Sequence, residues 1–474
     1  MEKAEKLQEQ EDEVLVNATW LFKVVKDRLH FWRTADGEPY VEVTEKGQRI
    51  FLPIKSEAFR TYLYAQVPDK LLTSHAVNEI VFWATATAKS APVEEAWMRV
   101  GKKEGCIYYD LGDRSVRITS LNWEVGGEGP RFIRTPAMLG QVEPCKTSRS
   151  LQDLLGSLVN ATPHQIDLMA GWLVGAMMPG GPYPVLIING EEGTAKTTAT
   201  RLLRRIVDPH ELDIRPPPKT ARDLIAQVKN SYVFALDNVS SIRQELSDSL
   251  CRLATGAPMG GRQLYSDYYE AAFPACRPVI LNGIPEFVEM PDLMSRSINI
   301  QLSPIDSTKR IDDVTFWQKV DEVLPEIMGA LFSSVSRALA NYDKVKLPNL
   351  PRMATFMRWC CAAFGEDWAE TFSRVEKESV AHLIEHDTIA QALITFMEGK
   401  DTCTMTAQLW LDHLVTTTPT LEFWPKTVKQ FMNRLDRIKG TLKKTNFVII
   451  RHGRERKTGR TILEIRRSET TKSP

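Results

Sequence analysis

The sequence lacks the features that mark membrane-spanning and secreted proteins. No apolar run comes near the roughly 18 residues that a transmembrane helix needs. The first residues, Met1 to Glu13, are mostly charged and contain no apolar signal-peptide core. The 474 residues include only seven cysteines, an odd number without a CxxC pair, which indicates reduced thiols rather than a disulfide framework. We therefore expect a cytoplasmic protein with no membrane partner.

The chain also lacks a net charge, because 60 Lys and Arg balance 60 Asp and Glu. This average hides a gradient: the segment from Lys426 to Arg467 holds fourteen basic residues and only three acidic ones. A basic segment attached to an otherwise acidic chain is typical of nucleic-acid binding. The length and the 43% share of hydrophobic residues fit a soluble globular protein of about three domains.

The rest of the sequence is organised around the stretch from Pro184 to Thr198. An apolar, β-branched run ends at Ile188 in a glycine-containing turn, and a helical segment then opens with Lys196. The spacing Gly190, four residues, Ala195, Lys196 and Thr197 matches a Walker A loop, except that Ala195 stands where glycine is usual. A chance match is the alternative, and the strand before the loop and the helix after it argue against chance.

The chemistry of such a loop assigns a role to each of its groups. Backbone N–H groups surround the β-phosphate beside the positive end of the following helix. Lys196 would reach the β- and γ-phosphate oxygens, and the Thr197 hydroxyl would complete the shell of a Mg²⁺ ion. The predicted ATP-binding residues are Gly190, Glu191, Glu192, Gly193, Thr194, Ala195, Lys196, Thr197 and Thr198.

A second acidic element follows in the stretch from Ser231 to Val239. Mostly apolar residues lead into Asp237, which predicts a buried parallel strand with a carboxylate at its C-terminal end. Asp237 would hold Mg²⁺ through water, the Walker B role, and an ordinary turn residue is the alternative. The next residue, Asn238, stands where many such ATPases carry a second acid. Asparagine can orient a water but cannot take its proton, and orientation suffices for the glutamine of small GTPases.

Three further elements follow this acid. Arg262–Phe273 has two β-like arms around a tyrosine-rich tip, and Arg277–Gly283 predicts another buried strand that ends at Asn282. A polar residue at such a strand end can contact the γ-phosphate and the attacking water. Arg296 precedes an alternating strand and could reach the nucleotide of a neighbouring subunit as an arginine finger. A structural salt bridge is the alternative for Arg296.

In this order the motifs resemble the AAA+/superfamily 3 ATPases of phages and integrated elements. They are similar to the helicase part of poxvirus-type primase-helicases. The resemblance covers about residues 30 to 467 and is most specific from 182 to 304. The sequence departs from the pattern at Ala195 and at Met294-Ser295, where an acid often precedes the arginine. No primase-type acidic motif is evident upstream, so priming is not expected.

The resemblance implies a homo-oligomer, a hexameric ring with ATP and Mg²⁺ between subunits. It gives the Walker A, Walker B, sensor 1 and finger roles to Lys196 with Thr197, Asp237, Asn282 and Arg296, and Asn238 completes the predicted catalytic set. Thr197 and Asp237 are the predicted metal ligands. The resemblance also implies that the 262–273 hairpin points into the pore toward single-stranded DNA. Its predicted DNA contacts are Arg262, Tyr265, Tyr268 and Tyr269.

The basic tail predicts a winged helix. Apolar residues recur at helical spacing between Val428 and Leu442, and the hairpin arms Phe447–Arg451 and Thr461–Ile465 flank a basic turn. A further helix is expected near Ala407–Val415. Such modules place a helix in the major groove of duplex DNA and the hairpin along phosphates. The predicted contacts are Lys429, Arg437, Arg454 and Arg456. Protein contact is the alternative, and the fourteen basic residues favour DNA.

The predicted fold is an α/β P-loop NTPase core of the AAA+-like type at 151–304, with an N-terminal α+β domain at 1–150, a helical lid at 305–380 and a C-terminal winged-helix domain at 381–474. The predicted function is an ATP-dependent DNA translocase or helicase in replication of a phage or mobile element. The alternative is a DNA-bound AAA+ initiator, loader or defence switch in which ATP controls assembly. A small-molecule P-loop kinase is disfavoured by the tail and by Arg296. His382 and His386 fit an inverted zinc-protease spacing, but no third ligand follows.

Overall fold

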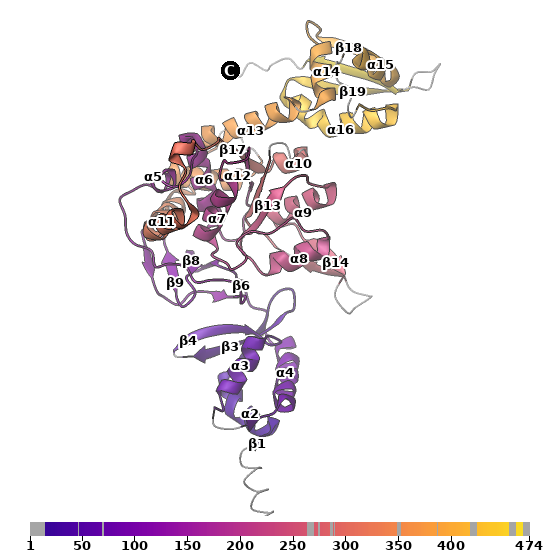
Figure 1. The fold of residues 1–474 in the computed structure, drawn as a ribbon. Coiled ribbons are helices and arrows are strands. Elements are labelled where there is room, and N and C mark those ends of the chain that lie inside the picture. Colours follow the sequence, from indigo (N-terminus) through magenta and orange to yellow (C-terminus); the bar gives the residue numbers. More distant parts are fainter. Residues whose placement is uncertain are drawn as a thin grey trace, which may run out of the picture.

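The computed structural model describes residues 15–45, 47–68, 71–262, 270–273, 275–284, 288, 290–347, 352–385, 387–417, 424–454 and 461–467. In Figure 1 an N-terminal unit, a large central unit and a C-terminal unit follow one another. The long helix α13 (Trp368–Glu385) joins the central unit to the C-terminal one.

The N-terminal unit has a hydrophobic core of its own. An antiparallel sheet of β2, β3 and β4 packs against helices, with Leu21, Val41, Phe59 and Val77 fully buried between them. The helices α2, α3 and α4 each begin after a side chain that accepts a hydrogen bond from a backbone N–H of the first turn. Its elements are β1 (Leu15–Val16), α2 (Ala18–Val25), η1 (Lys26–Arg28), β2 (His30–Arg33), β3 (Pro39–Glu45), β4 (Gln48–Pro53), α3 (Glu57–Ala65), β5 (Leu71–Leu72) and α4 (Ser74–Lys89).

A second group of strands, within residues 96–132, does not belong to this N-terminal core. The strands are β6 (Ala96–Trp97), β7 (Val100–Lys103), β8 (Cys106–Asp110), β9 (Ser115–Ile118), β10 (Trp123–Val125) and β11 (Arg131–Phe132). Four of them form an antiparallel sheet in the order β10-β9-β8-β7, whose side chains Tyr109, Val116 and Trp123 belong to the core of the central unit. The boundary expected at residue 150 therefore does not separate two hydrophobic cores, because this small sheet buries its apolar face against central helices.

The central unit is built on a parallel sheet of four strands in the order β13-β16-β12-β17. Because β16 lies between β12 and β13, the carboxyl ends of these three strands meet at one edge. The elements are α5 (Leu151–Gly156), α6 (Pro163–Ala176), β12 (Val185–Gly190), α7 (Lys196–Val207), α8 (Ala221–Lys229), β13 (Phe234–Val239), α9 (Gln244–Thr255), β14 (Met259–Arg262), β15 (Glu270–Phe273), β16 (Val279–Gly283), α10 (Pro291–Met294) and β17 (Ser297–Leu302).

The two faces of this sheet bury different residues, as the alternation of side chains along a strand requires. Leu186 and Ile188 face the core that contains α6, α7 and α11 (Asp313–Asn341), whereas Val185 and Ile187 face the core that contains α9. The predicted strand before the glycine loop and the helix after it are thus confirmed. The predicted hairpin also forms, since β14 pairs with β15, but its first arm ends at Arg262 rather than beginning there.

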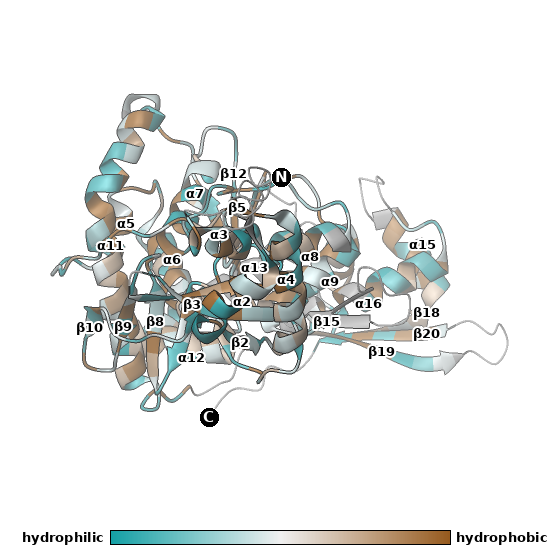
Figure 2. Cartoon of the chain, turned by 90° about the horizontal axis from the view of Figure 1, so that it is seen from below, coloured by the Kyte–Doolittle hydropathy of each residue, from teal (hydrophilic) through white to brown (hydrophobic). Residues whose placement is uncertain are grey.

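Helices after the sheet complete the central core rather than forming a separate lid. They are η2 (Ser307–Lys309), α11, α12 (Ala354–Phe364) and the start of α13. Leu331 and Phe356 are fully buried in the same core as the sheet. Gly171 and Gly175 allow this packing, because a Cβ at either position would overlap the ring of Trp368 or Phe356. Among the described residues α11 alone is long and apolar enough to cross a membrane, and 61% of its apolar window is buried within the protein, as in a core helix. In Figure 2, hydrophobic and hydrophilic stretches alternate along α11.

The C-terminal unit contains α14 (Thr388–Phe396), β18 (Thr402–Thr406), α15 (Ala407–Thr417), α16 (Val428–Lys444), β19 (Phe447–Arg454) and β20 (Thr461–Arg467). The predicted helices and hairpin are confirmed, and the apolar stripe of α16 enters the core through Phe431 and Leu435. The short strand β18 was not predicted; it pairs with β20, which gives the antiparallel order β18-β20-β19. All seven cysteines of the chain are free thiols.

Candidate nucleotide site and DNA-binding unit

The glycine loop, residues 190–196, turns sharply between β12 and α7. Gly193 and Ala195 both adopt left-handed backbone conformations, with φ of +78° and +59°. For an alanine this conformation costs about 1–2 kcal/mol, so the loop geometry is imposed by its surroundings. One such contact is the Thr194 hydroxyl, which donates to the Glu191 carbonyl at 2.9 Å. The loop therefore turns through two left-handed residues although alanine stands where the Walker A spacing usually has glycine.

Lys196 lies inside this loop. Its Nζ donates to the carbonyl oxygens of Gly190 and Glu191, both at 2.7 Å. Burial lowers the pKa of Lys196, and the carboxylates of Asp237 and Glu192 partly offset that effect. An ammonium beside the first N–H groups of a helix is a suitable partner for an anion such as phosphate.

Thr197 and Asp237 come together across the sheet edge. The Thr197 hydroxyl donates to Asp237 Oδ1 at 2.9 Å. A hydroxyl and a carboxylate supply the oxygen ligands that Mg²⁺ prefers, and the ion takes its remaining ligands from water and phosphate. No cluster of three or more His, Cys, Asp or Glu side chains that could hold a metal occurs in the described part of the chain. The pair thus fits Mg²⁺ held jointly with a nucleotide.

Asn282, near the end of β16, connects the neighbouring strand β13 with helix α7. It is 1% exposed. Its Oδ1 accepts from the backbone N–H of Asn238 at 3.0 Å, and its Nδ2 donates to Thr200 Oγ1 at 2.9 Å. Thr200 in turn donates to the Lys196 carbonyl at 2.9 Å. The structure therefore brings Lys196, Thr197, Asp237 and Asn282 to one edge of the sheet.

Asn238 has a backbone role that the sequence did not reveal. Its φ is +52°, at the point where the pairing register of β13 shifts between Leu236 and Val239. Asparagine is among the residues that best tolerate this left-handed conformation. The side chain of Asn238 is exposed, whereas its backbone N–H binds Asn282. Asparagine is therefore favoured at position 238 by the left-handed backbone, whether or not its side chain also orients a water molecule.

Arg296 makes the structural salt bridge that was the alternative to a finger. It pairs with Asp292, and its Nη1 also donates to the Asp292 carbonyl at 3.2 Å. Arg352 joins this group, with Nη1 at 2.7 Å from Asp292 Oδ1 and 2.6 Å from Ser295 Oγ. Burial raises the pKa of Asp292, but the hydrogen bonds from the two arginines outweigh it and hold that pKa below its usual value. Within one chain Arg296 is thus bound to Asp292.

One arginine beside the loop, Arg310, is not among the predicted site residues. Arg310 lies in the irregular segment after β17, and its Nη2 would be 3.0 Å from a Cβ placed on Gly193. No motif marks this position, because the segment approaches the loop only through the tertiary fold.

The predicted DNA contacts are described only in part. Lys429 is exposed in the first turn of α16. The remaining predicted contacts lie outside the described residues, as whole residues or as side chains: Arg262, Tyr265, Tyr268, Tyr269, Arg437, Arg454 and Arg456. His386 and the side chain of His382 also lie outside them. Two other basic residues of this unit pair within it, Arg434 with Asp387 at 3.2 Å and Arg451 with Asp436 at 2.5 Å.

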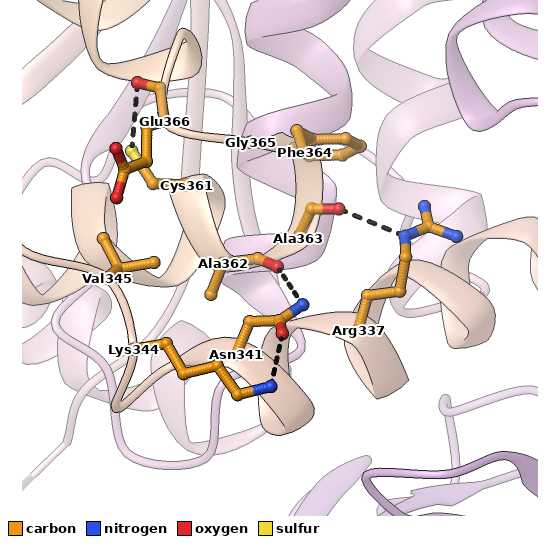
Figure 3. Close-up of a pocket in the computed structure, with 10 residues that line it drawn as sticks. All are labelled: Arg337, Asn341, Lys344, Val345, Cys361, Ala362, Ala363, Phe364, Gly365 and Glu366. Atoms are coloured by element: carbon orange, nitrogen blue, oxygen red, sulfur yellow. Dashed lines mark hydrogen bonds between the residues drawn. The ribbon is translucent and has the colours of Figure 1, made fainter.

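A separate pocket of about 520 Å³ lies between the C-terminal ends of α11 and α12 (Figure 3). Arg337 Nε donates to the Ala363 carbonyl at 3.1 Å, and Asn341 Nδ2 donates to the Ala362 carbonyl at 3.3 Å. These side chains satisfy carbonyls that the end of α12 leaves unpaired. We assign this pocket a structural role.

Two family models match the chain. Residues 152–377 match the replication protein of actinomycete integrative conjugative elements, and residues 389–473 match the C-terminal domain of the same protein. The chain belongs to this replication protein family. The gap between the two matches falls at the end of α13, where the central unit gives way to the C-terminal one. The prediction of a replication protein of a mobile element is therefore confirmed.

No curated protein matches the chain. Among solved structures, the A form apo structure of the NrS-1 C terminal region is 14% identical, with a TM-score of 0.44, and the match covers 95% of this chain and 99% of that one. An apo structure of the same region, 305-718, gives the same identity and coverage with a TM-score of 0.41. Similarity at this level carries no conclusion about function.

Proposed function

We propose that this replication protein is an ATP-dependent DNA translocase or helicase with an AAA+-like P-loop core. The observation that carries the proposal is the meeting of Lys196, Thr197, Asp237 and Asn282 at one edge of the parallel sheet. Polar groups gathered at the carboxyl ends of parallel strands are the usual place for a ligand in such sheets. The membership of a replication protein family makes DNA the fitting context for an ATPase.

Each residue has a task in this proposal. Loop N–H groups and Lys196 bind the phosphates, and Thr197 with Asp237 holds Mg²⁺, which when bound would draw negative charge from the phosphate oxygens. The Oδ1 of Asn282 and one hydrogen of its Nδ2 are bound to Asn238 and Thr200, and the remaining amide hydrogen would contact the terminal phosphate or orient water. No acid follows Asp237, so the chain supplies orientation rather than a strong base there.

The proposal includes a homo-oligomeric ring, with a hexamer as the expected size. Arg296 lies immediately before β17, and its side chain would exchange the carboxylate of Asp292 for the nucleotide of a neighbouring subunit. The β14–β15 hairpin would reach single-stranded DNA in the pore. In the C-terminal unit, helix, strand, two helices and a hairpin follow in the order of a winged helix, and α16 would enter the major groove of duplex DNA.

The decisive experiment measures ATP hydrolysis with and without single-stranded DNA for wild type, Lys196→Ala and Arg114→Ala. We expect DNA to stimulate wild type and the Arg114 variant, an exposed control, and Lys196→Ala to be inactive. An active, assembled preparation that DNA does not stimulate would count against a translocase. Particle mass with and without ATP tests the oligomer separately.

A second candidate is a DNA-bound initiator, loader or switch in which ATP controls assembly. The hairpin distinguishes the two. Replacement of Tyr268 and Tyr269 by alanine should abolish unwinding by a translocase while duplex binding by the C-terminal unit persists. Strand separation at the wild-type rate in this variant would favour the second candidate.

A further inference from the structure

The connector between β17 and α11, residues 303–312, runs against the glycine loop. Its start is held by Asn160, whose Nδ2 donates to the Ser303 carbonyl at 3.0 Å. Its middle touches the loop, because the backbone N–H of Ile305 donates to the Gly193 carbonyl at 3.4 Å. Its end is fixed by Asp312, which caps α11 by accepting the Thr315 N–H at 3.0 Å. The connector is thus anchored at both ends and in contact with the loop between them.

Arg310 extends this contact with a guanidinium. Its Nε donates to the Ile305 carbonyl at 3.4 Å, which turns the side chain back toward the loop. A Cβ on Gly193 would lie 3.0 Å from Arg310 Nη2 and 3.8 Å from its Cζ. The guanidinium therefore lies directly over the Cα of Gly193, and a side chain there would displace it. No carboxylate in the described ranges is ion-paired with Arg310, and the residue is exposed.

This position is chemically suited to phosphate. The planar guanidinium presents several donors in a fixed geometry that matches two oxygens of one phosphate group, whereas an ammonium acts as a point charge. Lys196 binds the first carbonyls of the loop, at Gly190 and Glu191, and Arg310 lies at Gly193. The two cations therefore flank the loop at different points along it.

We propose that Arg310 contacts the terminal phosphate of a bound nucleoside triphosphate from within the same chain. The inference rests on the proposed nucleotide binding and adds a residue and a regulatory step to it. Arg310 precedes the cap of α11 by two residues, so its contact with the terminal phosphate adds a nucleotide-dependent bond to the start of that helix. Loss of the phosphate on hydrolysis removes this one contact, while the bonds at Ser303, Ile305 and Asp312 remain, so the support of the connector depends in part on the nucleotide state.

The test compares binding of fluorescent ATPγS, ADP and AMP to the full chain. The variants are Arg310→Ala, Arg310→Lys, Lys196→Ala and the control Arg114→Ala. Arg310→Ala should weaken ATPγS binding by about 10-fold or more, as expected for loss of charge-assisted hydrogen bonds, and leave ADP affinity within about twofold. Arg310→Lys should restore part of the ATPγS affinity, because it keeps the charge without the paired donors.

Other outcomes separate this inference from the proposed function. If Arg310→Ala binds ATPγS as wild type does while Lys196→Ala does not, the Arg310 contact is wrong and the nucleotide site stands. Equal weakening of ATPγS, ADP and AMP would also overturn it, since the contact would not be to the terminal phosphate. If wild type binds no nucleotide, the proposed function itself fails. Thermal unfolding of each variant checks that the exposed Arg310 can be replaced without loss of the fold.

Discussion

The side-chain oxygen of Asn282 accepts a hydrogen bond from the backbone N–H of Asn238 at 3.0 Å. The two residues end neighbouring strands, and the left-handed backbone of Asn238 directs its N–H toward β16. The other end of the Asn282 amide binds Thr200 on α7, the helix that begins with Lys196. One buried amide thus aligns the glycine loop with the acidic strand.

Replacement of Asn282 by alanine should distinguish its role in ATP hydrolysis from nucleotide binding. Two partners, the Asn238 N–H and the Thr200 hydroxyl, lose a buried hydrogen bond, which should cost about 1–3 kcal/mol in the free energy of unfolding. We expect ATP hydrolysis to fall by about 100-fold, as for other transition-state hydrogen-bond donors, while ATPγS still binds. Urea unfolding and steady-state hydrolysis measure the two effects. Asn282→Asp keeps the acceptor for Asn238 and should recover part of the stability but little of the activity.

Substitutions at Asn238 should distinguish its backbone from its side chain. Asn238→Gly fits φ of +52° and should leave the stability nearly unchanged, whereas Asn238→Ala should lose about 1 kcal/mol. If the exposed amide orients water, both variants hydrolyse ATP slowly. If only the backbone matters, the glycine variant keeps its activity. A glycine variant less stable than the alanine variant would contradict the conformational argument.

Mixing variants tests whether Arg296 acts on a neighbouring subunit. Arg296→Ala and Lys196→Ala should each be inactive as pure oligomers, with nucleotide binding kept in the first. A mixture should regain hydrolysis at interfaces that combine an intact loop with an intact arginine. The salt bridge of Arg296 with the half-exposed Asp292 is worth about 0–1 kcal/mol, so the fold should survive. A mixture no more active than its components would leave Arg296 with its structural role alone.

The buried carboxylate of Asp208 should be essential for stability. It is 0% exposed, and it accepts hydrogen bonds from Arg99 Nε at 3.1 Å and from the backbone N–H groups of Tyr232 and Val233. Asp208→Ala leaves the buried Arg99 charge unpaired and should cost about 3–5 kcal/mol in urea unfolding. Glu143→Ala, which removes an exposed partner of Arg114, should cost about 0–1 kcal/mol. A loss at Asp208 no larger than at Glu143 would show that the strands of residues 96–132 do not depend on this pair.

Lys429 tests the orientation of α16 on DNA. If Lys429 contacts a phosphate, Lys429→Ala should weaken duplex binding by the same factor for all DNA sequences. The slope of log affinity against log salt concentration should then fall by about one. Fluorescence anisotropy over a range of salt concentrations measures this slope. Lys400→Ala, in the same unit but outside α16 and its hairpin, is the matched control. An unchanged slope for the Lys429 variant would place the DNA on another face.

Local patterns in the sequence determined most of the elements of this protein. The apolar run before Gly190, the spacing to Lys196 and the apolar residues before Asp237 and Asn282 predicted strands and strand ends that the structure contains. The helical stripe from Val428 to Leu442 likewise predicted α16. These predictions depend on periodicity and on residue preferences over a few neighbours, and such signals are complete within a short stretch of sequence.

Only the tertiary structure decided which elements meet. It placed β16 between β12 and β13, so that Asn282 binds both Asn238 and Thr200, and it brought Arg310 to Gly193 across more than one hundred residues. In the folded chain Arg296 also pairs with Asp292, and the strands of residues 96–132 pack into the central core. The physical reason is that strand order and side-chain partners follow from burying whole faces of sheets and helices, and this burial joins residues that no local pattern relates.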